Sequence, residues 1–430
     1  TLAAGGVGES IFQPQWSPGG VLHFVSDRTD WWNIYAWNAG SIQAVFAMDA
    51  EFGKPQWNFG ASTYGFQDAN RLICSYTQDG VWHQAKMDID TGTLEPLATP
   101  YAEMNRGDLA VGLDAMVMVA GSPSQPYSVV KVDLATGEAQ VLRRSSSATV
   151  DPAYLSVPEA IEFATENGGT AHAYYYPPKN DDFQAPDTEL PPLLVKSHGG
   201  PTSAAGTSLE LSIQYWTSRG FGLVDVNYGG SAGYGRRYRQ RLNGQWGIVD
   251  VDDCVNAARS LVQRGLADER RLAIDGGSAG GFTTLAALTF RDFFGAGASY
   301  YGVSDLETLA KDTHKFESRY LDSLIGPYPQ RRDLYQQRSP INHVEGLSCP
   351  LILFQGLEDK IVPPDQAELM YQAVRAKRIP TAYIAFEGEQ HGFRQAANIK
   401  RALDAEFYFY SRVFSFTPAD SLEPVAIDNL

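Results

Sequence analysis

Cysteine, positive charge and long apolar runs are all scarce in this sequence, and each shortage excludes a class of protein. Only three cysteines occur among 430 residues, at Cys74, Cys254 and Cys349, far apart and without metal-ligand spacing. A set this sparse argues against a disulfide framework and fits a reducing compartment, so we expect a cytoplasmic protein. The 34 Lys+Arg against 50 Asp+Glu give a net charge of −16, and a surface this acidic repels nucleic acid.

The sequence contains no segment that predicts a membrane-spanning helix. Residues 31–48 carry no charge, but Asn, Gln, Ser and Gly interrupt them, and aromatic residues cluster there as in short strands. The N-terminal Thr-Leu-Ala-Ala-Gly-Gly has neither a basic region nor an apolar core, so it does not resemble a signal peptide. Because it lacks an initiator Met, we expect that it comes from a longer or processed chain.

Residues 1–150 predict short strands with an internal repeat. The two repeated motifs are Pro14-Gln15-Trp16 with Pro55-Gln56-Trp57, 41 residues apart, and Asp88–Gly92 with Asp133–Gly137, 45 residues apart. Such a period is typical of propeller blades, and this length holds about three of them. Closed propellers usually need at least four blades, so we expect a missing N-terminal propeller segment to complete the ring. An open all-β domain is the alternative.

Residues 151–430 follow a different pattern. After an expected hairpin (157–164 and 170–176), short apolar runs alternate with helical patterns; the runs are 193–197, 221–227, 272–275, 297–301, 351–355 and 382–386. The clearest helices span about 250–265, with Asp250 and Gly265 as caps, and 365–377. This alternation predicts a mostly parallel, doubly wound α/β sheet with helices on both faces.

A G-x-S-x-G motif supplies a candidate nucleophile. Gly276-Gly277-Ser278-Ala279-Gly280 lies between an apolar strand and an apolar helix, where this motif forms an elbow that exposes the serine. The same pattern surrounds Ser231, but arginines follow it, and such a segment cannot be buried behind an elbow. We predict that Ser278 is the nucleophile and Ser231 a loop residue. The alternative for Ser278 is a glycine-rich helix start that binds an anion or nothing.

A serine nucleophile needs a histidine base, which an acid orients. Three histidines follow Ser278, and only His391 comes directly after a predicted strand; His314 and His343 lie in polar segments and are expected at the surface.

The acid follows the strand 351–355. Glu358 and Asp359 both fit by position, whereas Asp365 better suits a helix N-terminus.

Acyl transfer also needs two N–H donors for the developing oxyanion. The residue after the nucleophile, Ala279, supplies one. The second is expected from Gly199 or Gly200 in His198-Gly199-Gly200-Pro201, which follows the strand 193–197.

Four ordered motifs together resemble the prolyl oligopeptidase family of serine peptidases, most closely its acylaminoacyl-peptidase-like branch; they are His198–Pro201, Asn227–Gly235, Gly276–Gly281 and Gln390–Phe393. The resemblance implies an α/β-hydrolase domain (151–430) preceded by propeller blades (1–150) that restrict access to short peptides. It implies that Asp359 is the acid, and that the substrate pocket draws on Tyr301, Phe316 and Val362.

The sequence departs from the family pattern at three positions. Gly229 follows Asn-Tyr where many relatives have Arg, and Gln355 replaces a His before Gly356. His198 begins the motif that carries a Tyr donor in prolyl oligopeptidase itself, so strict proline preference is not implied.

We therefore expect a serine peptidase that needs no metal or other cofactor and cleaves short peptides from the N-terminal side. It would act as an aminopeptidase, acylaminoacyl-peptidase or oligopeptidase, with no nucleic-acid or membrane partner, and it is compatible with a homo-oligomer. A carboxylic ester hydrolase on the same fold is the alternative, and a non-catalytic propeller binding protein is the third hypothesis.

Overall fold

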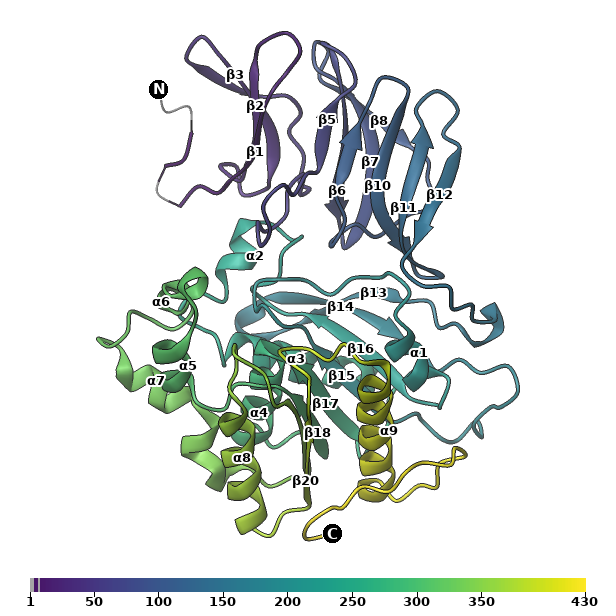
Figure 1. Ribbon diagram of the computed structural model, residues 1–430, viewed down its shortest axis with the longest axis vertical. Coiled ribbons are helices and arrows are strands. Elements are labelled where there is room, and N and C mark those ends of the chain that lie inside the picture. The colour runs from purple at the N-terminus through teal and green to yellow at the C-terminus, as the bar shows by residue number, and fades with distance from the viewer. Residues whose placement is uncertain (1–3, 7) are drawn as a thin grey trace. The chain divides into compact units, whose positions relative to one another are not determined.

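The computed structural model describes residues 4–6 and 8–430, which divide into two compact units (Figure 1). Unit 1 extends to Ala160 and includes the short segments Gly206–Leu211 and Ser231–Gln240. Unit 2 contains Ile161–Ala205, Ser212–Gly230 and Arg241–Leu430. The domain boundary expected at 150/151 lies near the end of the first segment of unit 1 and stays a prediction.

Unit 1 consists mainly of three four-stranded antiparallel sheets, which correspond to the expected propeller blades. The first two sheets run in chain order, with β1 (Ile11–Trp16), β2 (Leu22–Ser26), β3 (Asn33–Asn38), β4 (Ser41–Ala44), and then β5 (Tyr64–Phe66), β6 (Arg71–Gln78), β7 (Val81–Asp88), β8 (Thr93–Leu97). The third has β9 (Leu109–Val111), β10 (Ala115–Ser122), β11 (Gln125–Asp133) and β12 (Ala139–Arg144). The uncharged run 31–48 thus forms strands.

One of the two sequence repeats is also a structural repeat. Asp88 ends β7 and accepts hydrogen bonds from the N–H and hydroxyl of Thr91, and Asp133 ends β11 with the same bonds from Thr136. These turns join the third and fourth strands of their blades. The Pro-Gln-Trp repeat is not equivalent, because Pro14 lies in β1 whereas Pro55 precedes β5.

Arginines hold the segment after Ser231 within unit 1. This segment forms the five-residue helix α2 (Arg236–Gln240). The guanidinium of Arg239 lies 2.7 Å from both the Asp27 and the Glu51 carboxylates, and the Gly235 N–H also donates to Glu51. Ser231 is therefore in a loop that precedes a short polar helix, as predicted, and not in an elbow.

An eight-stranded sheet forms the centre of unit 2. Its order is β13-β14-β16-β15-β17-β18-β19-β20, with β13 (Glu159–Ala164), β14 (Thr170–Tyr176), β15 (Leu193–Ser197), β16 (Gly222–Asn227), β17 (Leu272–Gly277), β18 (Ala296–Tyr300), β19 (Leu351–Gly356) and β20 (Thr381–Phe386). The neighbours from β16 to β20 all pair in parallel, and β14 pairs antiparallel with β16. The mostly parallel sheet is as predicted.

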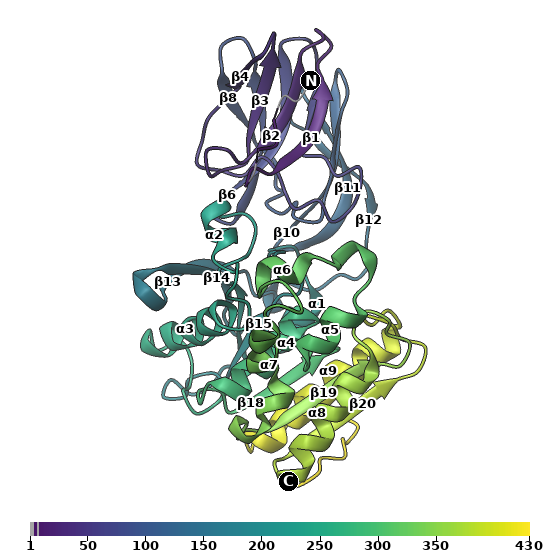
Figure 2. The same ribbon diagram turned by 90° about the vertical axis from the view of Figure 1, so that its left-hand side faces the viewer.

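Helices cover both faces of this sheet (Figures 1 and 2). One face packs against α3 (Val249–Gln263), α4 (Ala279–Phe290) and α8 (Pro364–Ala376), and the other against α1 (Leu211–Thr217) and α9 (Ala396–Val413). Neighbouring strand residues point to opposite faces, so Val195 joins the first core and Leu194 the second. Shorter helices α5 (Leu306–Asp312), α6 (Tyr320–Leu324) and α7 (Arg332–Arg338) follow β18.

The predicted cap at Asp250 is wrong, whereas the one at Gly265 is confirmed. Helix α3 already begins at Val249, and the buried Asp250 carboxylate accepts hydrogen bonds from the Gly247 N–H and the Thr283 hydroxyl of α4. Gly265 follows the last turn with a φ of +71°, which glycine adopts without strain.

Of the helices formed by residues 4–6 and 8–430, none combines the length and apolar character that crossing a membrane requires.

Candidate active site

Ser278 lies in a strained turn between β17 and α4. Its φ of +58° is in the left-handed region, where side chains other than glycine are uncommon. The turn also forces close backbone contacts, because a Cβ at Gly280 would lie 2.1 Å from the Ser197 carbonyl oxygen. Only glycine fits there, which explains why the motif surrounds the serine with glycines.

Ser278, His391 and Asp359 form a continuous chain of hydrogen bonds. The Ser278 Oγ lies 2.8 Å from His391 Nε2, and His391 Nδ1 lies 2.8 Å from Asp359 Oδ2. Since a carboxylate only accepts, Nδ1 carries the proton and Nε2 accepts from the serine hydroxyl. The Asp359 side chain is fully buried, while the His391 ring is 22% exposed. Of these two side chains, only that of His391 is therefore accessible to solvent.

The loops that carry Asp359 and His391 lie against each other at the carboxyl ends of β19 and β20. A Cβ at Gly356 would lie 2.5 Å from the Gln390 carbonyl oxygen, so glycine allows this contact. Asp359 Oδ1 accepts the N–H groups of Ile361 and Val362, at 2.8 and 3.0 Å. These bonds fix the carboxylate so that its other oxygen faces the histidine.

The loop after β15 lies beside Ser278. A Cβ at Gly199 would come within 3.5 Å of the Ser278 Cβ, whereas the nearest atoms to one at Gly200 belong to Ser203 and Thr202. Ala279 begins α4, where backbone N–H groups have no partner within the helix. Gly199 is thus the glycine of this loop that lies nearer to Ser278, and the donor roles of Gly199, Gly200 and Ala279 stay predictions.

Tyr228 supports this loop, a contact that sequence reasoning did not identify. Its ring stacks on His198 at 4.3 Å, and its hydroxyl donates to the His198 carbonyl oxygen at 2.9 Å. Burial lowers the pKa of His198 to about 4, so this imidazole is neutral and serves the packing of the loop. The only sequence signal was the position of Tyr228 inside the Asn227–Gly235 motif.

The three predicted substrate residues lie in different environments. The Tyr301 ring is 4.9 Å from that of His391. Val362 is 1% exposed and binds Asp359 through its N–H, so it offers little surface to a substrate in this conformation. Phe316 is 65% exposed and stacks on His314, which pairs with Glu317. Roles for all three in substrate binding stay predictions.

Comparisons with known proteins agree with this fold. The model of the Prolyl oligopeptidase family matches residues 207–417. Dipeptidyl aminopeptidase BIII from Pseudoxanthomonas mexicana is 30% identical over 250 residues, which cover 56% of this chain and 36% of that protein. The acylamino-acid-releasing enzyme of Arabidopsis thaliana is 31% identical over 212 residues, covering 46% of this chain and 27% of that protein.

Solved structures of similar proteins superpose on nearly the whole chain. A puromycin-hydrolyzing peptidase from Mycobacterium tuberculosis superposes with a TM-score of 0.95 and 44% identity, covering 99% of this chain and 65% of that one. A puromycin hydrolase superposes with a TM-score of 0.92 and 39% identity, and it also covers 99% of this chain and 65% of that one. The chain spans between about a third and a half of the first curated relatives that it matches.

The fold and site define the class of protein: an α/β hydrolase that is preceded by propeller blades. Within that class, residues 207–417 match the model of the prolyl oligopeptidase family, in agreement with the resemblance seen in four sequence motifs. The ester-hydrolase alternative finds no support in these comparisons.

Proposed function

We propose that this protein is a serine peptidase that hydrolyses short peptides, with Ser278 as nucleophile, His391 as base and Asp359 as orienting acid. The observation that carries the proposal is the pair of 2.8 Å contacts that join the three side chains. The names of the relatives, aminopeptidase and acylamino-acid-releasing enzyme among them, support peptides as the substrate class.

The reaction follows from this geometry. Ser278 Oγ attacks the scissile carbonyl carbon while His391 Nε2 takes its proton, and the N–H groups of Ala279 and Gly199 stabilise the oxyanion. The C–N bond then breaks, and the imidazolium returns the proton to the leaving amine. Water, deprotonated by His391, hydrolyses the resulting acyl-serine. Asp359 holds the Nδ1–H tautomer throughout and stabilises the imidazolium.

The substrate is a peptide cleaved close to its N-terminal end. Two relatives are named for releasing N-terminal units, and two similar structures are named for hydrolysing puromycin. A further structure of the puromycin hydrolase is described as an S511A mutant complexed with PGG. An aminopeptidase-type activity fits these features best, and the scarcity of cysteine favours a reducing compartment such as the cytoplasm.

Replacement of the two G-x-S-x-G serines tests the proposal. Ser278→Ala should lower kcat on aminoacyl and dipeptidyl anilides by at least about 10³-fold, because the nucleophile is lost. It should also abolish labelling by a fluorophosphonate probe. Ser231→Ala is the matched control and should retain both properties, provided its melting temperature is unchanged. Full labelling of Ser278→Ala would contradict the assignment.

A further inference from the structure

The loop between β20 and α9 carries His391, and the side chain of Glu389 ties the two ends of this loop together. Its Oε2 accepts a hydrogen bond from the backbone N–H of Arg394, and its Oε1 accepts one from that of Gln395, each at 2.9 Å. Oε1 also accepts a hydrogen bond from the side-chain Nδ2 of Asn398, in the first turn of α9, at 2.9 Å. His391 therefore lies in a loop that one carboxylate closes.

The backbone of Glu389 contacts the loop that carries the orienting acid. The Glu389 carbonyl oxygen accepts a hydrogen bond from the Glu358 N–H at 2.9 Å, and Asp359 is the next residue along the chain. A Cβ on Gly356 would lie 2.6 Å from the same carbonyl oxygen, so the two loops are in close contact there. Glu389 thus links the loop of His391, through its side chain, to the loop of Asp359, through its backbone.

Glu389 makes these contacts as a buried anion, since the residue is only 2% exposed. Burial raises the pKa of its carboxyl group, but the hydrogen bonds from Asn398, Arg394 and Gln395 outweigh burial and keep the pKa below its ordinary value of 4.5. The carboxylate also lies at the N-terminal end of α9, where a helix favours negative charge. Hydrogen bonds to an ionised acceptor are stronger than those to a neutral one, so these three bonds constrain the loop.

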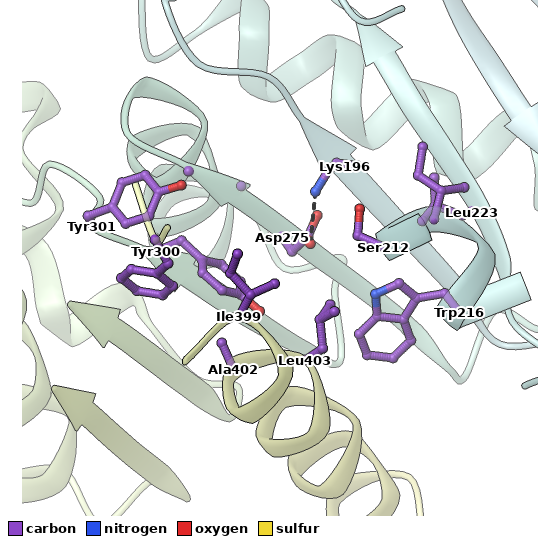
Figure 3. A pocket seen from close by; sticks show the side chains of 14 residues that line it. Lys196, Ser212, Trp216, Leu223, Asp275, Tyr300, Tyr301, Ile399, Ala402 and Leu403 are labelled. Atoms are coloured by element: carbon purple, nitrogen blue, oxygen red, sulfur yellow. Dashed lines mark hydrogen bonds and ion pairs between the residues drawn. The ribbon is translucent and has the colours of Figure 1, made fainter. Parts of the chain in front are cut away.

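Apolar packing alone does not fill the space beside this loop. The ring of Phe393, two residues after His391, packs against that of Tyr301 with 5.3 Å between the ring centres. Both residues also line a pocket of about 250 Å³, to which α9 contributes further side chains (Figure 3). A pocket offers no atoms that resist a movement of its lining, so the apolar side constrains the loop less than a filled core would. The position of His391 therefore depends on the polar side of the loop, where Glu389 lies.

We propose that Glu389 is a positioning residue, whose carboxylate holds His391 within hydrogen-bonding distance of both Ser278 and Asp359. Each of these two contacts is 2.8 Å long, and a misplacement of about 1 Å can cost about 10²-fold in rate. Glu389 acts through the loop and takes no part in the bond changes. The inference rests on the proposed function, because it concerns the same triad, so its test includes a measurement that needs no substrate.

Glu389→Gln tests the proposal, because it keeps the shape of the side chain but removes the charge and one of the two accepting oxygens. On one anilide substrate, kcat should fall about 10- to 100-fold while KM changes less than about threefold. The rate of fluorophosphonate labelling should fall at least about tenfold, since it depends on the same contact between His391 and Ser278. Glu387→Gln is the matched control, because Glu387 is an exposed acid two residues earlier in the same loop. It should leave kcat and the labelling rate unchanged.

Proton NMR of the His391 Nδ1–H distinguishes positioning from a general loss of stability. In the wild type this proton is bonded to the Asp359 carboxylate, so it should give a far-downfield resonance that Asp359→Asn removes. The resonance should broaden or move upfield in Glu389→Gln and stay unchanged in Glu387→Gln. Because the spectrum requires no substrate and no turnover, it tests the role of Glu389 independently of the proposed function.

Asn398→Ala remains informative if Glu389→Gln fails to fold. It removes one of the three donors to the carboxylate, and alanine suits a helix. It should lower the labelling rate about two- to fivefold, as expected for the loss of one hydrogen bond.

Three outcomes would overturn the proposal: an unchanged resonance and labelling rate in Glu389→Gln, equal losses in Glu387→Gln, or a lower melting temperature of Glu389→Gln with a normal resonance. The last would show that Glu389 only stabilises the fold. A wild-type protein that the fluorophosphonate probe does not label would instead contradict the proposed function, and the NMR comparison would still decide the role of Glu389.

Discussion

The carboxylate of Asp359 is held through both of its oxygen atoms, and this distinguishes it from its neighbour Glu358. Oδ1 accepts hydrogen bonds from two backbone N–H groups of the same turn, and Oδ2 accepts a hydrogen bond from the Nδ1–H group of His391. Gln355, which is fully buried, donates to the carbonyl oxygens of Gly356 and Val362 at either end of this turn. Glu358 is exposed instead. Position alone does not choose between the two carboxylates, and in the structure Asp359 is the one that contacts His391.

Asp359→Asn should therefore lower kcat by about 10⁴-fold, because an amide favours the wrong histidine tautomer while preserving the shape of the site. Glu358→Gln is the matched control and should change kcat by less than about threefold, since it removes a solvated charge. Steady-state kinetics on one anilide substrate compares the two variants. Similar losses in both would contradict the assignment of the acid.

At the scale of the elements, the junction of β15, β17 and α4 leaves no room for side chains. The Ser197 hydroxyl donates to the Gly280 carbonyl oxygen at 2.9 Å, which ties the first turn of α4 to the end of β15. A Cβ on Gly280 would collide with the Ser197 backbone, and one on Gly276 would lie 2.4 Å from the Gly280 carbonyl oxygen. Backbone atoms cannot move aside as the end of a flexible side chain can. The absence of side chains at these glycines therefore allows the strands and the helix to lie this close together.

Gly280→Ala should lower the melting temperature by about 2–10 °C, because overpacking of this kind costs about 1–3 kcal/mol. The elbow should also shift, so kcat should fall together with stability. Gly19→Ala serves as control, since a Cβ there would meet no atom closer than 3.8 Å. Scanning calorimetry and kinetics measure both effects. A Gly280→Ala variant as stable and active as wild type would refute this explanation of the glycines.

The sequence predicts elements well where the signal is local. The run 193–197 matches β15, and the run 272–275 falls two residues short of β17, because apolar residues bounded by polar and glycine residues predict buried strands directly. Asp250 was misassigned as a cap because its partner Thr283 lies on another helix, 33 residues away. Local patterns cannot reveal a contact of this kind.

The same limit applies to the site. Ser278 and His391 could be predicted because each follows a strand, and the carboxyl ends of the parallel strands β17 to β20 lie at one edge of the sheet. The Tyr228 contact with His198 depends on how distant segments pack. Phe316, placed in the substrate pocket by resemblance, is largely exposed. Motifs therefore predict the three side chains that meet at the site better than they predict the side chains that support or surround them.

At the scale of the whole molecule, some of the Asp and Glu side chains that contribute to the net charge of −16 are buried. Burial raises the pKa of Glu51 in unit 1 and of Asp250 in unit 2 to about 6, and that of Glu406 to about 8. In the unfolded chain these carboxyl groups lose their protons near their ordinary pKa values. Between the ordinary pKa and the raised pKa, the folded state therefore binds more protons than the unfolded chain does. These groups consequently favour folding most at low pH, and their contribution is lost as pH rises to the folded pKa.

Glu406 isolates this effect in one side chain. Its ordinary pKa is 4.5, so the cost of burying it should grow from about pH 4.5 to about pH 8 and then level off. Glu406→Gln keeps the acceptor for the Tyr300 hydroxyl but cannot ionise. Its melting temperature relative to wild type should therefore rise steadily between pH 5 and 8, whereas that of the exposed Glu368→Gln should differ from wild type by a constant amount. A difference for Glu406→Gln that does not change with pH would show that the folded protein ionises this carboxyl as readily as the unfolded chain does.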